Sequence, residues 1–216
     1  MEVLRALAPQ FECTTGHHLS AGYDPTNAIK RQIEDGAVFD VAIVTRLVLD
    51  DLTQQGIIAP DTRANIARCG LGIAVRKGAP KPDIGTTEAF KQTLLKAKSV
   101  TYLKEGASTI HLRKLFVQLG IAEAIRDKAV ETEGEMVSEL VAEGKVELGL
   151  IVVPNIMSVP GAELVGPLPK DINSIVMFTA GVSAISPNQQ AARELIKLLK
   201  SPEAKPVIQA KGNDPA

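Results

Sequence analysis

One stretch decides the fold, and it reads Ser99-Val-Thr-Tyr-Leu-Lys-Glu-Gly-Ala-Ser-Thr-Ile-His-Leu-Arg-Lys-Leu-Phe-Val-Gln-Leu119. Residues 100–103 are of the types that favour a short buried strand. A turn with a glycine follows, and then Ser108, which is a good N-cap for a helix. Apolar residues recur at helical spacing from there until Gly120. The stretch therefore predicts a strand that runs through a Gly/Ser/Thr loop into the amino end of a helix.

This junction has the chemistry to hold a small anion. The first turn of a helix has free N–H groups and a partial positive charge. Ser108 and Thr109 would add hydroxyl donors beside it. A plain capped helix behind a strand has the same pattern, so the stretch alone leaves both interpretations open.

Strands and helices alternate along the rest of the chain. The pattern predicts an amphipathic helix over residues 3–11 and strands over residues 18–23, 38–44, 66–75, 100–103, 128–132, 147–153 and 175–185. Helical segments separate most of these strands. Such alternation predicts an α/β protein with mostly parallel sheets.

Hydroxyl and amide side chains recur where the predicted strands end. Parallel sheets bind ligands beyond the carboxyl ends of their strands. The candidate ligand-binding residues at these ends are Thr26, Asn27, Thr45, Ser108, Thr109 and Asn155. Each of them could be an ordinary cap or turn residue, but their recurrence favours a shared site for an oxyanion.

Composition argues against several other classes of protein. The chain has 216 residues and a net charge of −1, without a basic run or any Trp, so nucleic-acid binding is not expected. No apolar run approaches the roughly 18 residues of a membrane span. The two cysteines, Cys13 and Cys69, form neither a CxxC motif nor a zinc-ligand set, and no cofactor or metal is expected.

Six segments, in order along the chain, carry a resemblance to a known family: residues 28–44, 71–80, 106–109, 141–150, 191–196 and 201–204. Together they make the chain similar to type 2 periplasmic solute-binding proteins, and within that class to the molybdate-binding-protein-like family. The resemblance implies two α/β lobes joined by two crossing strands, 66–76 and 175–185, with the ligand held between the lobes. Residues 1–76 and 177–216 would form lobe 1, and residues 77–176 lobe 2.

The resemblance also implies a small anionic ligand, an ABC transporter permease as partner and a periplasmic location, although the chain as written begins without an export signal, as a cytoplasmic protein would. The identity of the ligand remains open: it could be molybdate, another oxyanion or a carboxylate. Asp24-Pro-Thr-Asn27 stands where the family usually offers serines, and Pro154-Asn155 stands where true molybdate binders tend to place a tyrosine.

An enzyme is the alternative. Of the three histidines, His111 lies in the first turns of the predicted helix, close to Lys104 and Glu105. It is either a surface or capping residue, or a proton-transfer group for an isomerase that acts on a small unsaturated carboxylic acid. No Ser-His-Asp spacing, HExxH motif or Walker loop suggests another reaction. A ligand-sensing domain that acts through a partner protein would use the same cleft.

One strand of the resembling fold is not represented. In that class, the first strand lies between the two that would here be residues 19–23 and 39–44, whereas this chain starts in the following helix. Unpaired strand edges are costly when buried. We therefore expect that the natural chain begins upstream, that the sheet re-pairs, or that another molecule donates a strand and causes self-association.

Overall fold

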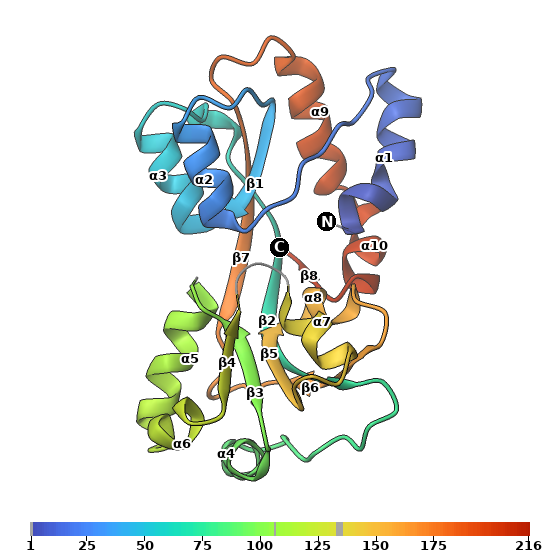
Figure 1. Ribbon diagram of the computed structural model, residues 1–216. Coiled ribbons are helices and arrows are strands. Elements are labelled where there is room, and N and C mark those ends of the chain that lie inside the picture. Colours follow the sequence, from blue (N-terminus) through green and yellow to red (C-terminus); the bar gives the residue numbers. More distant parts are fainter. Residues whose placement is uncertain (1, 106, 133–135) are drawn as a thin grey trace. The chain divides into compact units, whose positions relative to one another are not determined.

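The computed structural model describes residues 2–105, 107–132 and 136–216. Its contacts divide the chain into two compact units: Met1–Arg68 with Met177–Ala216, called unit 1, and Cys69–Val176, called unit 2. The chain changes unit inside two long strands, β2 (Ala64–Arg76) and β7 (Ile175–Val182), which Figure 1 shows in green-blue and orange. That these units act as two lobes around a ligand stays a prediction.

Unit 1 is built from five α-helices, a short 3₁₀ helix and strands that pair antiparallel. The helices are α1 (Glu2–Thr15), α2 (Thr26–Glu34), α3 (Arg46–Gln54), α9 (Gln189–Leu199) and α10 (Ala204–Ala210), with the 3₁₀ helix η1 (Pro60–Thr62). Strand β1 (Val41–Thr45) pairs with β7, and β8 (Asp214–Pro215) pairs with β2. The amphipathic helix predicted over residues 3–11 is confirmed as α1, which buries Leu7 and Phe11.

Strand β1 has a helical layer on each face. Val41 and Ile43 pack with α1, α9 and α10, while Ala42 and Val44 pack with α2 and α3. This two-sided burial explains why the segment is almost wholly apolar.

The strand predicted over residues 18–23 is wrong, because this segment has no regular structure. An isolated extended segment gains nothing from strand geometry without a neighbour to hydrogen-bond. Among the described residues β1 is accordingly an edge strand, paired only with β7. Self-association through this edge stays a prediction.

Unit 2 contains the stretch that decides the fold. Its elements are α4 (Thr87–Lys96), β3 (Val100–Leu103), α5 (Ala107–Gln118), α6 (Ala122–Arg126), β4 (Ala129–Thr132), α7 (Met136–Ala142), β5 (Leu148–Val152), α8 (Val153–Met157) and β6 (Ala162–Pro167). The predicted strand and helix are confirmed as β3 and α5, but α5 begins at Ala107, so Ser108 lies in its first turn and is not the N-cap. The glycine of the predicted turn, Gly106, lies outside the described residues. Gly120, with φ of 67°, follows the end of α5 as expected.

Helices cover both faces of the sheet in unit 2. Helices α4, α5 and α6 pack on one face, where Phe90, Leu94 and Phe116 are buried against Tyr102 of β3. Helices α7 and α8 pack on the other face through Val137 and Ile156. Figure 1 shows β3 between β4 and β5, with α5 and α7 on opposite sides of them.

The α/β class is confirmed, but the sheets are mixed, which corrects the expectation of mostly parallel sheets. Strand β3 is parallel to β4 and β5, whereas β1 with β7, and β2 with β5, β6 and β8, pair antiparallel. Parallel neighbours need a helical crossover. The chain supplies such crossovers only between β3, β4 and β5, and β2 and β7 instead enter from the other unit.

Asn173 fixes the loop after β6 to strand β2. Its Oδ1 accepts from the Leu71 N–H at 2.9 Å, and its Nδ2 donates to the carbonyls of Leu71 at 3.3 Å and Leu168 at 3.1 Å. The amide reaches the strand because position 70 is a glycine: a Cβ on Gly70 would lie 2.7 Å from Nδ2.

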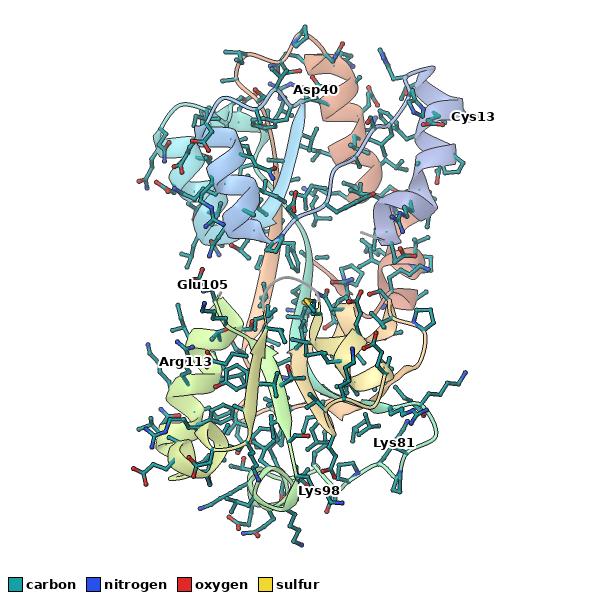
Figure 2. The ribbon with its side chains drawn as sticks, viewed as in Figure 1. Cys13, Asp40, Lys81, Lys98, Glu105 and Arg113 are labelled. Carbon is teal, nitrogen blue, oxygen red and sulfur yellow. The ribbon has the colours of Figure 1, made fainter. Side chains whose placement is uncertain are left out.

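An ionic contact ties α5 to the sheet. Glu131 of β4 accepts from Tyr102 Oη at 3.0 Å and from Arg113 Nη2 at 2.9 Å, and Figure 2 shows Arg113 on α5. Burial alone would raise the pKa of Glu131, but the hydrogen bonds from Arg113 and Tyr102 and the positive charge nearby hold that pKa below its ordinary value. Burial, and then the contact with Glu131, raise the pKa of Tyr102.

The first prediction is a double-mutant cycle at Asn173. Asn173→Ala leaves the Leu71 N–H without its partner and should lower the free energy of unfolding by about 1–3 kcal/mol. Gly70→Ala should cost a similar amount by displacing the amide, but much less in the Asn173→Ala background. Gly166→Ala is the control, because its Cβ would meet only Ile84 Cδ1 at 3.6 Å. Urea denaturation measures these free energies of unfolding. If Gly70→Ala lowers the free energy of unfolding equally in wild type and in Asn173→Ala, this account is contradicted.

The second prediction concerns acid stability. Because the folded pKa of Glu131 is lowered, its ionic contact contributes stability above the unfolded value near 4.5 and loses it as pH falls through the folded pKa. Glu131→Gln should therefore lower the melting temperature at pH 7. Below the folded pKa of Glu131, the melting temperature of the variant should be close to that of wild type. Glu123→Gln on α6 is the control: the Glu123 side chain is exposed and forms no ion pair with another described residue, so this variant should melt like wild type at pH 7. A constant difference between wild type and Glu131→Gln from pH 7 to pH 3 would argue against the ionic contact.

Candidate functional site

The carboxyl ends of β3, β4 and β5 form one edge of unit 2, because the three strands are parallel and adjacent. Helix α5 starts just beyond β3, and α8 directly follows β5. Figure 2 shows Glu105 at this edge, where β3 ends and α5 begins. Three of the predicted site residues, Ser108, Thr109 and Asn155, belong to these two helices.

Ser108 and Thr109 have different surroundings in the first turn of α5. Thr109 is 2% exposed, and its hydroxyl donates to the Leu103 carbonyl at 2.7 Å, which closes the turn between β3 and α5. Ser108 is half-buried, and its hydroxyl has no hydrogen-bond partner within the described residues. The structure therefore gives the Thr109 hydroxyl a local structural role and leaves the Ser108 hydroxyl available to a ligand.

Asn155 lies in the middle of α8 and is half-buried. Its backbone carbonyl accepts from Ser158 Oγ at 3.1 Å, while its side-chain amide has no partner in the part of the chain that the structure describes. An amide offers both a donor and an acceptor, so this side chain suits a ligand that carries oxygen atoms of either kind.

His111 is oriented by the backbone. Its Nε2 lies 2.8 Å from the Ile172 carbonyl, and since a carbonyl can only accept, Nε2 is the protonated nitrogen. In the neutral ring, Nδ1 is then a proton acceptor, and among the described residues it has no partner. A histidine fixed in one tautomer by a carbonyl is an arrangement that a general base can use, although it also occurs in purely structural histidines.

The candidate residues of unit 1 lie at the ends of β1 and α2. Thr45 is the last residue of β1 and precedes α3, without a capping bond from its side chain. Thr26 and Asn27 are the first two residues of α2, Thr26 half-buried and Asn27 exposed. Pro25 stands at the capping position of α2, so this helix begins without a capping bond from a side chain.

An ion-pair network holds α2 against α3. Lys30 of α2 contacts Glu34 on the same helix and Asp51 of α3. These hydrogen bonds raise the pKa of Lys30 and lower the pKa values of Glu34 and Asp51. The network helps to fix α2, the helix whose amino end carries Thr26 and Asn27. Its charges are partly exposed, so solvent screens their attraction and its contribution to stability is small.

Three buried hydroxyls were not predicted as site residues: those of Thr101, Thr132 and Ser138, all in unit 2, have no hydrogen-bond partner among the described residues. Thr132 ends β4 and so belongs to the edge described above. In the sequence, these residues look like ordinary members of a strand or helix. Only the packed structure shows that their hydroxyls lack partners.

The described residues give no sign of a metal site, because they contain no group of three His, Cys, Asp or Glu that could hold an ion. None of the described helices is long and apolar enough to cross a membrane. A shallow hollow of about 580 Å³ in unit 1 is lined by residues such as Arg63, Arg193 and Lys197. It contains none of the predicted site residues.

Comparisons with known proteins agree on the type of protein. A family model for bacterial extracellular solute-binding proteins matches residues 1–213. An aconitate isomerase from Pseudomonas sp. is 33% identical over 221 residues, which span all of this chain and 84% of that protein. A molybdate-binding protein from Azotobacter vinelandii is 28% identical over 223 residues, which span 97% of this chain and 84% of that protein.

Solved structures support the same fold. A periplasmic molybdate-binding protein from Azotobacter vinelandii superposes with a TM-score of 0.81 at 19% identity, over 98% of this chain and 93% of that one. The predicted type 2 periplasmic binding-protein fold and the likeness to the molybdate-binding family are confirmed. The chain belongs to the bacterial extracellular solute-binding protein family.

Proposed function

We propose that the protein binds a small oxyanion or carboxylate and delivers it to an ABC transporter permease or to a sensing partner. The observation that carries this proposal is the set of free, uncharged donors at the strand edges. Ser108 and Asn155 in unit 2 have no intramolecular partner for their side chains in the described structure. Membership of a solute-binding family adds support for binding as the function.

Neutral donors can hold an anion without a fixed positive charge. Backbone N–H groups at the start of α5, together with a serine hydroxyl, provide several charge-assisted hydrogen bonds. Each such bond is shorter and stronger than one between neutral groups. A site of this kind suits a small ligand that carries negative charge over several oxygen atoms.

The third prediction tests Ser108 as a ligand residue. Ser108→Ala removes a donor to the anion and should weaken binding by about 1.5–3 kcal/mol, or roughly 10- to 150-fold. Thr86→Ala is the matched control: Thr86 caps α4, which Figure 1 places at the opposite end of unit 2 from the carboxyl end of β3. That variant should lose stability but not affinity.

Titration calorimetry against a panel provides the measurement. The panel should include molybdate, tungstate, sulfate and the two geometric isomers of aconitate, because the relatives include a molybdate-binding protein and an aconitate isomerase. Unchanged affinity of Ser108→Ala for a ligand that wild type binds would move the site elsewhere. Failure of the wild-type chain to bind any small anion would overturn the proposal.

Isomerisation of an unsaturated carboxylic acid is the second candidate function. Two observations favour it: the 33% identity to an aconitate isomerase, and the orientation of His111 by the Ile172 carbonyl. In such a reaction, a base removes a proton from the carbon next to the double bond, the double bond shifts, and a proton returns to a different carbon. With Nε2 bonded to the Ile172 carbonyl, Nδ1 is the nitrogen of a neutral His111 ring that would accept that proton.

The fourth prediction separates the two functions. As a binding protein, the chain at catalytic amounts should leave each aconitate isomer unchanged in a proton NMR time course. Conversion by wild type that is lost in His111→Gln would instead establish the isomerase. Glutamine is chosen because its amide can still donate to the Ile172 carbonyl, so that loss of activity would report proton transfer and not a misplaced loop.

A further inference from the structure

The hollow in unit 1 has two walls that come from distant parts of the sequence. One wall is η1 with the start of β2, and the other is α9 with the segment that follows it. An ion pair joins the walls, because Arg193 Nη2 lies 2.9 Å from Asp61 Oδ2. Thr62 accepts from the Val182 N–H at 2.9 Å, which fixes η1 to β7. Contacts within unit 1 therefore hold the hollow in shape.

Positive charge predominates around this hollow. Asp61 and Asp50 neutralise the two arginines: Arg193 pairs with Asp61, and Arg63 lies 2.6 Å from Asp50. The two lysines are exposed and form no ion pair with a described residue. The chain as a whole has a net charge of −1, so the surplus is local. The four cations that line the hollow are Arg63, Arg193, Lys197 and Lys200.

The end of α9 explains only part of this charge. Cations near the carboxyl end of a helix are favoured by its dipole, which suits Lys197 and Lys200. The dipole does not account for Arg193 in the first half of α9, or for Arg63 on the other wall. What the four cations share is the hollow between them.

The spacing of the cations indicates the shape of a complementary partner. Arg193, Lys197 and Lys200 lie four and three residues apart, which places them on one face of α9. The first and the last are about 10 Å apart along the helix axis, at about 1.5 Å per residue. One compact anion cannot span that distance, whereas carboxylates two residues apart in an extended peptide stand about 7 Å apart on the same side. Between the cations, Ala64 and Ile196 are buried and form an apolar floor.

We propose that this hollow docks an acidic segment of a partner protein. The segment lies along α9 with its carboxylates on Lys197 and Lys200 and an apolar side chain on Ile196. This inference goes beyond the proposed function, because it requires a second protein and does not depend on the identity of the small ligand. The hollow contains none of the candidate ligand residues, so the partner and the ligand use different parts of the chain.

The test uses a labelled synthetic peptide in which alternating glutamate and serine flank a central leucine. Fluorescence anisotropy at low salt should show binding to wild type that weakens as salt is added, and no binding of the same peptide with glutamine for glutamate. Lys197→Gln with Lys200→Gln should weaken binding about fivefold or more. Lys197→Arg with Lys200→Arg keeps both charges and should keep the affinity.

The matched control is Lys114→Gln with Lys170→Gln. It removes the same charge from two exposed lysines of unit 2 that form no ion pair with a described residue, and peptide affinity should stay within about twofold of wild type. Melting temperatures of all variants show whether each is folded. Equal peptide affinity of folded Lys197→Gln with Lys200→Gln and of wild type overturns the inference, as does failure of wild type to bind the glutamate peptide at low salt.

Calorimetry with molybdate, sulfate and the aconitate isomers separates this inference from the proposed function. Lys197→Gln with Lys200→Gln should bind the small anions as wild type does. Loss of small-anion affinity in that variant would make the hollow the site of the small ligand and would overturn the inference. If wild type binds the peptide but none of the small anions, the inference holds and the proposed function fails.

Discussion

Burial of β3 and β5 on both faces is the constraint on which unit 2 depends. Val100 and Leu150 on one face, and Thr101 and Ile151 on the other, are each at most 1% exposed, so helices must cover the sheet on both sides. A chain that covers both faces while its strands stay parallel must return through helical crossovers. These crossovers bring the carboxyl ends of β3, β4 and β5 to one edge, and each strand end is followed by a helix. The position of the candidate site thus follows from how the core is buried.

The sequence allowed prediction of the elements that its local pattern determines. The strand and helix within residues 99–119 and the amphipathic helix at the amino end were correct, because apolar spacing acts within a few residues, whereas the predicted N-cap, Ser108, lies inside α5. The strand over residues 18–23 failed, because a strand depends on a neighbour that local sequence does not describe. The expectation of mostly parallel sheets was wrong for β2 and β7 for a similar reason, since their antiparallel pairs join segments that are far apart in the sequence.

Prediction of the candidate site met the same limit. Sequence reasoning found hydroxyls after strands, but it could not tell which of them are already occupied: Thr109 donates to Leu103, whereas Ser108 does not bond within the described chain. Nor does the sequence indicate that packing leaves the hydroxyls of Thr132 and Ser138 without a partner among the described residues. Which hydroxyls lack an intramolecular partner is visible only in the packed structure.

The edge position of β1 has a consequence for the exchange of backbone hydrogens with solvent. In an antiparallel pair, alternate residues direct their N–H groups toward the partner and the others direct them away. Since β7 is the strand that pairs with β1 in the described structure, protection should alternate along Val41–Thr45, although the side chains on both faces are packed. The apolar contacts and the hydrogen bonds of this strand would then report two different local stabilities.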